Sequence, residues 1–260
     1  MNRYDYIGKV NTNNQGLQMI IVDYHCNSDV EVIFDGYENK PIKCRYSNFK
    51  RGAVKNPYYP EVFGVGYKGE NFKISDIEKS YERKIYSMWH GMLERCYSEK
   101  SQVRNKTKSY KGCTVCDEWL CYANFREWVI NQENFIFWCK DKYGIDKDII
   151  NKNNKVYCSD YCCLVPHYIN NLFTNHRSHR GEYPIGVSIN CYNTFTVSCN
   201  DINGKTRHFG NFKTPEDAFM FYKNYKENII QTIAKTEFAD RRITEKCYIG
   251  MMKCRIEIDD

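Results

Sequence analysis

The chain has 260 residues, of which 42% are hydrophobic and 15% aromatic, and its formal net charge is +6. This composition is typical of a soluble, folded protein with two or three small domains, and no stretch approaches the roughly 18 to 20 uninterrupted apolar residues that a membrane span requires. The opening "MNRYDYIGKVN" also lacks the apolar core of a signal peptide, so we expect a cytoplasmic protein whose fourteen cysteines are thiols.

Residues 1–70 are expected to form a small β-barrel of about five short strands. The segment "GLQMIIVDYHCNSDVEVIFDG" holds two apolar runs separated by a Cys-Asn-Ser-Asp turn, and Asp35-Gly36 forms the next turn. The prolines and glycines of "NPYYPEVFGVGYKG" then end regular structure. This pattern loosely resembles a Src-homology-3-like module, and a protein is one partner that such a module could bind.

Helical signals begin at Ser75. The segment Ser75-Asp76-Ile77-Glu78 has the form of a capping box, in which a hydroxyl and a carboxylate satisfy the first amides of a helix. Apolar side chains then recur at helical spacing to about Cys96, and a second short helix follows in "CDEWLCYANFREWV". Most of the aromatic residues in these helices are expected to form a core.

A basic segment lies between these two helices. Residues 79–111 contain nine Lys or Arg against three Glu, and "KSQVRNKTKSYK" at 100–111 contains five bases and no acid. Such a loop suits the phosphates of a nucleic acid, although a solvated loop is the alternative. The predicted backbone contacts are Lys100, Arg104, Lys106, Lys108 and Lys111.

The segment 145–178 has the pattern of two strands and a helix. "GIDKDII" can form the first strand, "VYCSDYCCLVP" the return strand, and Pro166 can begin a helix through "PHYINNLFTNH". Ile169, Leu172 and Phe173 would face the core of that helix, so His167 and Asn170, which are three residues apart, would share another side. This order of elements is the minimum that a ββα-metal nuclease requires.

Here the sequence resembles the phage-type HNH endonucleases, over about residues 80–178. The lead-in "YSMWHGMLERCY…YKGCTVCDEWLCYANFREWV" and the motif "IDKDI…Y…C…P…IN" carry the resemblance. It implies that Asp146 and Asn170 hold Mg²⁺ or Mn²⁺, and that Lys147 stands where the family has its general-base histidine. A lysine serves poorly as that base, so Asp148, His167 and His176 are the alternative candidates.

Structural zinc is an alternative use of this region. Cys113-x-x-Cys116 has the spacing of a zinc knuckle, and Cys158 with Cys162 or Cys163 would complete four thiolates. The second pair is not spaced as a knuckle, and buried cysteines are often small hydrophobic residues, so this hypothesis is secondary.

Residues 182–235 read as three strands followed by a helix. Asp201-Ile202-Asn203-Gly204 is a hairpin turn, and Thr214-Pro215 begins the helix. Strand alternation puts the apolar side chains of the sheet against the helix and gathers polar ones on the other face. The predicted polar face, which could read base edges of DNA, consists of Ser188, Asn190, Tyr192, Thr196, Ser198, Asn200, Thr206 and His208.

This part resembles the APETALA2-type DNA-binding domain through "IGVSIN…FTVSCND…RHFGNFKTPEDAFMFY". That family reads DNA with arginines and tryptophans on the same sheet face, where this sequence has smaller polar residues. The resemblance implies docking on duplex DNA, and an ordinary solvated sheet face is the alternative reading.

We therefore expect an α+β protein with a β-barrel at 1–70, an HNH-like domain at 71–180, an APETALA2-like domain at 181–235 and a tail at 236–260. The expected function is a metal-dependent DNA endonuclease, encoded by a phage and acting in the cytoplasm of its host. The alternative is a degenerate HNH scaffold that binds DNA or a host factor without cutting, which Lys147 favours.

Overall fold

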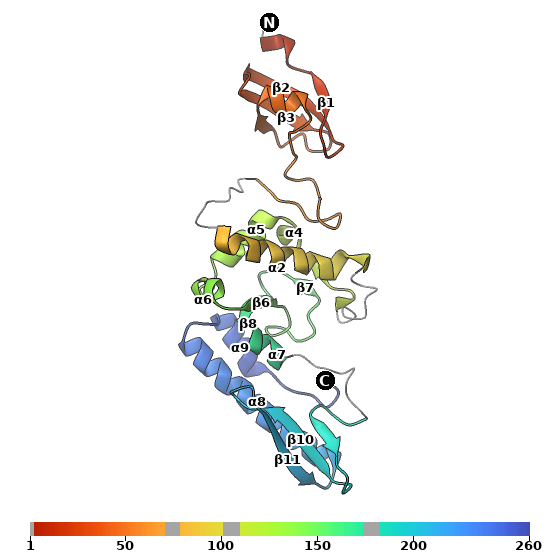
Figure 1. Cartoon of the computed structure of the whole chain (residues 1–260), viewed down its shortest axis with the longest axis vertical. Helices are drawn as coiled ribbons and strands as arrows, with labels where there is room; N and C mark the ends of the chain where they lie inside the picture. The colour runs from red at the N-terminus through yellow and green to blue at the C-terminus, as the bar shows by residue number, and fades with distance from the viewer. Residues whose placement is uncertain (1–2, 71–78, 101–109, 174–181) are drawn as a thin grey trace. The chain divides into compact units, whose positions relative to one another are not determined.

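The computed structural model describes residues 3–70, 79–100, 110–173 and 182–260. It has a mixed α+β fold with several small sheets, as expected (Figure 1). The chain divides into two compact units, the first comprising Met1–Glu61 and Tyr67–Asn71, and the second Val62–Gly66 and Phe72–Asp260. Within the ranges described, no helix has both the length and the apolar character needed to cross a membrane.

The first unit is built on one antiparallel sheet, ordered β1-β2-β3-β4. Two apolar runs form its central strands, with alternate side chains such as Met19, Ile21, Val30 and Val32 fully buried. The turns fall where the sequence predicts them, after Cys26 and after Phe34. The elements are η1 (Arg3–Asp5), β1 (Val10–Thr12), β2 (Gln18–Cys26), β3 (Asp29–Phe34), β4 (Ile42–Cys44) and α1 (Tyr46–Lys50).

The predicted closure of this sheet into a barrel is wrong for the residues that the structure describes. β1 and β4 are the two edges of an open sheet, and each is only three residues long. Closing a barrel requires strands long enough to tilt and pair around the full circle. Helix α1 covers the core instead, through the buried ring of Phe49.

The second unit begins with a helical core. Trp89, Trp119, Phe125 and Val129 are buried as their helical spacing predicts, and the Trp89 indole donates a 2.7 Å hydrogen bond to the Trp119 carbonyl oxygen. The predicted capping box at 75–78 lies outside the described residues. The elements are α2 (Lys79–Tyr97), β5 (Thr114–Val115), α4 (Asp117–Leu120), α5 (Tyr122–Ile130) and α6 (Phe135–Lys140).

A strand, a loop, a return strand and a short helix follow this core. β6 (Tyr143–Asp146) pairs antiparallel with β8 (Cys163–Pro166), so that Tyr143 lies opposite Pro166 and Asp146 opposite Cys163. The loop between them contains β7 (Val156–Tyr157), which pairs in parallel with β5. The chain passes directly from β8 into α7 (His167–Leu172), as the proline at position 166 suggests.

The last part of the unit is a three-stranded antiparallel sheet with a long helix. The strands are β9 (Val187–Ile189), β10 (Phe195–Asn200) and β11 (Thr206–Phe212), in the order β11-β10-β9. Helix α8 (Pro215–Ala239) runs along the sheet and is capped by Thr214, whose hydroxyl accepts from the Asp217 amide at 3.1 Å (Figure 1). Val197 is buried as predicted, but Ile189 is 43% exposed because it ends a short edge strand.

A second core joins this sheet to the β6–β8 pair. Cys163, Val165 and Ile169 pack in the same buried cluster as residues from β10 and α8. The cluster also contains Cys247 and Met251 from α9 (Glu245–Lys253), a helix within the stretch 236–260 that is expected from the sequence to be a tail. The strand–loop–strand–helix segment and the three-stranded sheet are therefore held by one continuous core.

Candidate functional site

Asp146 lies at the end of β6 with its carboxylate fixed by the turn that follows. Its Oδ1 accepts hydrogen bonds from the backbone N–H groups of Asp148 and Ile149, both at 2.8 Å. The side chain is buried, and burial raises its pKa above the ordinary aspartate value, while the two amide donors act in the opposite direction. Both of these bonds go to Oδ1, and no donor in the described ranges bonds to Oδ2.

Lys147 is buried and serves as a donor inside the loop. Its Nζ donates to both carboxylate oxygens of Asp148, at 2.8 and 2.7 Å, and to the carbonyl oxygen of Asn154 at 2.7 Å. The side chain of Asp148 is itself 44% exposed. An ammonium group cannot take a proton from water. At this position of the motif Lys147 therefore holds the loop together through its three hydrogen bonds.

The asparagines of this loop close it on itself. The Asn154 Nδ2 donates to the carbonyl oxygens of Lys147 at 3.1 Å and Val156 at 2.6 Å. Asn153 has a φ of +64°, a left-handed conformation that asparagine tolerates better than most residues. The polar run 151–154 is therefore explained by the turn it makes between β6 and β7.

Asn170 and His167 lie over the face of β6 that also carries Asp146. A Cβ atom built on Gly144 would lie 3.9 Å from Asn170 Nδ2 and 3.9 Å from His167 Cε1. Gly144 and Asp146 are two residues apart on one strand, so they share a face and are separated by roughly 7 Å. The absence of a side chain at Gly144 leaves this face open between the helix and the carboxylate.

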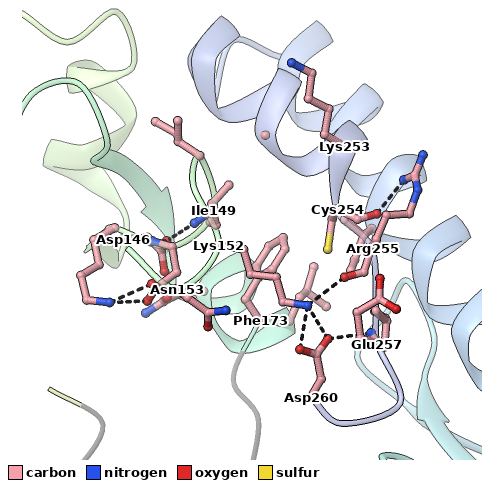
Figure 2. A pocket seen from close by; sticks show the side chains of 18 of the residues that line it. Asp146, Ile149, Lys152, Asn153, Phe173, Lys253, Cys254, Arg255, Glu257 and Asp260 are labelled. Carbon is pink, nitrogen blue, oxygen red and sulfur yellow. Dashed lines mark hydrogen bonds and ion pairs between the residues drawn. The ribbon is translucent and has the colours of Figure 1, made fainter. Parts of the chain in front are cut away.

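A cavity of about 680 Å³ contains both Asp146 and Asn170 among its lining residues. Figure 2 shows Asp146 on one side and the C-terminal segment 254–260 on the other, with Lys152 reaching across to Asp260 at 2.6 Å. Basic side chains outnumber acidic ones in the lining, six to four. The basic residues are Lys147, Lys152, Lys155, Lys226, Lys253 and Arg255, and the acidic ones are Asp146, Asp148, Glu257 and Asp260.

Most of these basic residues were not identified from the sequence. Lys226 comes from α8, Lys253 from α9 and Arg255 from the segment after it. Burial lowers the pKa of the Lys226 ammonium. No local motif indicates any of the three, because they reach the cavity only when α8 and α9 pack in one core with the β6–β8 pair.

His167 lines a second cavity, of about 550 Å³, which Asn170 also lines. Asn170 and Tyr110 line both cavities, so the two adjoin. Of the predicted catalytic residues, Asp146, Lys147 and Asp148 therefore line one cavity and His167 the other. His176 lies outside the described residues.

The four predicted zinc ligands do not form a cluster. In the ranges that the structure covers, no group of three or more His, Cys, Asp or Glu side chains is arranged to hold a metal ion. Cys113 and Cys116 flank the two-residue strand β5, and residues three apart along an extended chain point to opposite sides. Cys113 consequently lies beside Cys96, whereas Cys116 lies beside Cys158.

The polar face of the three-stranded sheet consists of hydrogen-bonded pairs across the strands. Ser188 pairs with Thr196, Ser198 with His208 Nδ1, and the Thr206 hydroxyl donates to Asn200, each at 2.9 Å. Asn190 donates to Thr194 at the hairpin, and Tyr192 is 82% exposed beside it. The predicted residues thus share one accessible face, and none of them carries a permanent positive charge.

The ends of the predicted basic loop are both exposed. Lys100 and Lys111 are the members that the structure describes. Arg104, Lys106 and Lys108 lie outside the described residues.

Comparison with known proteins assigns the chain to no family. The chain matches no protein-family model, no curated protein and no solved structure. The function therefore has to be inferred from the geometry of the site.

Proposed function

We propose that the chain is a metal-dependent DNA endonuclease of the HNH type, in which Asp146 and Asn170 hold one divalent cation. One observation above all supports this: Asp146 from β6 and Asn170 from α7 line the same cavity, over the same face of β6. The order β6, loop, β8, α7 is the order of elements that a ββα-metal site uses to hold a cation against a phosphate.

The residues suit Mg²⁺ or Mn²⁺. A carboxylate and an amide are oxygen donors, and Mg²⁺ takes few protein ligands and keeps several of its waters. Asp146 is buried with a raised pKa, and a divalent cation would compensate the negative charge that burial disfavours. When bound, such an ion would polarise the scissile phosphate and stabilise the charge that develops on it.

His167 is the better placed of the two described candidates for the general base. Both oxygens of Asp148 already accept hydrogen bonds from the Lys147 ammonium, so neither is free to receive a water molecule without competing with that contact. The imidazole of His167 is exposed and lies beside Asn170 above Gly144. Imidazole is the side chain that most often accepts a proton from an attacking water. We assign that role to His167 and the positioning of the loop to Lys147.

Duplex DNA would dock through the sheet of β9, β10 and β11, in the manner of an APETALA2-like module. The support is the accessible polar face on one side and α8 on the other, joined by a common core to the β6–β8 pair. The basic residues around the cavities and Lys100 and Lys111 would supply the phosphate contacts that the sheet face lacks. We retain a phage origin, action in the host cytoplasm and a protein partner for the first unit as parts of this proposal.

Nicking of supercoiled plasmid in Mg²⁺ or Mn²⁺ tests the proposal. We expect the wild-type protein to nick, and Asp146→Asn to lose activity by on the order of 100-fold or more, because the amide cannot supply the charge that binds the cation. His167→Gln should lower the rate, because an amide cannot accept a proton from the attacking water. Asp240→Asn, at an exposed position that lines neither cavity, is the matched control.

A second function is favoured by Lys147. Its ammonium fills the place of the expected base with a buried, fully engaged donor, which suits a scaffold that binds DNA without cutting it. Retardation of DNA without nicking, unchanged in Asp146→Asn, would support this reading. Absence of both nicking and retardation at low salt would reject the two functions together.

A further inference from the structure

Side chains from several separate parts of the chain line the second cavity. Helix α2 contributes Arg83, Ser87 and Arg95, the approach to β6 contributes Lys142, and α7 contributes His167 with Asn170. Arg83 and Ser87 are four residues apart, so they project from the same side of α2, one turn after the other. Hydrogen-bond donors therefore reach this cavity from two helices and a strand end.

The charge of this cavity is strongly one-sided. Its lining has four basic side chains and one acid, Asp141. Asp141 is already paired with Arg242 at 3.0 Å, so it does not neutralise the cavity. In the described ranges, no acidic side chain forms an ion pair with Arg83, Lys142 or Arg95.

The basic residues differ in what already holds them. The Lys84 ammonium donates to the Cys139 carbonyl oxygen at 3.0 Å. The Arg95 guanidinium lies 5.3 Å from the ring centre of Tyr110 and 5.7 Å from that of Tyr157, which fixes it at the back of the cavity. Arg83 and Lys142 are exposed at the rim, where a ligand can reach them.

We infer that this cavity binds a phosphodiester of the DNA backbone that flanks the phosphate held at Asp146 and Asn170. The inference rests on the proposed function, which fixes where the DNA strand lies. Asn170 lines both cavities, so a DNA backbone that crosses one cavity would enter the other. Arg83 and Lys142 would contact the flanking phosphate directly, with the Ser87 hydroxyl as a further donor. Arg95 would add positive potential from behind.

The test measures the affinity of a short DNA duplex as a function of salt, with EDTA present so that no cutting occurs. The double variant Arg83→Gln with Lys142→Gln is compared with Lys235→Gln and Lys246→Gln, which removes two exposed charges outside both cavities. If both rim residues contact phosphate, the slope of log K against log salt should fall by roughly two for the first variant, and affinity at low salt by on the order of 10-fold. The control variant should change neither by a comparable amount.

Placing a neutral methylphosphonate at single backbone positions sharpens the result. On wild-type protein, one position beside the nick should weaken binding, and the double rim variant should be insensitive to that same substitution. Equal slopes for the two double variants would overturn the inference even if the protein nicks DNA. A reduced slope in a protein that never nicks would keep the phosphate site and reject the endonuclease, so the two failures are distinguishable.

Discussion

The two surfaces that we propose to meet DNA are constructed in opposite ways. Around Asp146 three polar side chains, those of Asp146, Lys147 and Asn154, are buried, and their hydrogen bonds close the loop between β6 and β7. On the sheet of β9, β10 and β11 the polar groups are exposed and paired only with the neighbouring strand. The polar groups of the first surface help to hold the fold together, whereas those of the second lie on an exposed face of the sheet.

The two surfaces should therefore respond differently to substitution. A buried group whose partner is removed loses a hydrogen bond that water cannot replace, whereas an exposed group exchanges its partner for water at little cost. Substitutions around Asp146 should therefore affect stability and function together. Substitutions on the sheet face should affect DNA binding alone.

Replacing Lys147 with methionine should give the largest loss of stability. The change keeps most of the side-chain volume but leaves the buried Asn154 carbonyl oxygen without the ammonium that now reaches it at 2.7 Å. We expect the free energy of unfolding to fall by about 1 to 3 kcal/mol, measured by urea denaturation followed by tryptophan fluorescence. Lys155→Met, at an exposed position of the same loop, is the control. Equal losses of stability for the two variants would contradict the expectation that a buried contact costs more to remove than an exposed one.

The pH dependence of stability should identify the buried carboxylate of Asp146. Its folded-state pKa is raised, so the folded protein binds a proton more readily than the unfolded chain, and this contribution to stability is lost as pH rises through the folded pKa. In EDTA, the free energy of unfolding of the wild type should therefore gain on that of Asp146→Asn as pH falls from 7 towards 4.5. The gain is about 1.4 kcal/mol for each unit by which the folded pKa exceeds the unfolded one.

Adding Mg²⁺ at pH 7 should then stabilise the wild type and leave Asp146→Asn unchanged, because a ligand that binds only the folded state raises its stability by mass action. Parallel pH profiles for the two proteins would show that burial does not disfavour the charged form of this carboxylate. Equal Mg²⁺ effects would show that the carboxylate is not a cation ligand.

The smallest effect on stability is expected on the sheet. Ser198→Ala removes the 2.9 Å hydrogen bond to His208, but both partners are accessible to water. The free energy of unfolding should change by no more than about 0.5 kcal/mol, while the affinity for duplex DNA should fall by roughly 1 kcal/mol, or about fivefold. A loss of stability without a loss of affinity would reverse the comparison between the two surfaces.

Much of the local structure could be predicted because its signals are local. Asp201 to Gly204 makes the hairpin that its residues indicate, and Thr214 caps α8 in front of Pro215. The alternation that places Ser198 and His208 on one face also follows from the strand period alone. These features depend on backbone preferences within a few residues, which a sequence displays directly.

Other features needed the packed chain. Whether the first sheet closes depends on the lengths of β1 and β4 and on Phe49 arriving over its core. Cys113 and Cys116 look like a knuckle in sequence, and only the extended backbone of β5 sends them to opposite sides. Helix α9 completes a core whose other members lie far away along the chain.

For the candidate site, the types of side chain at 146, 167 and 170, and the order of strand, loop, strand and helix that carries them, can be read from the sequence. Only the folded chain reveals that Asp146 and Asn170 line one cavity, that Lys226 and Arg255 line it too, and that Arg83 and Lys142 line the adjoining one. The physical reason is that residue chemistry and backbone preference are local properties, whereas proximity across the fold arises when buried faces from distant segments pack into one core.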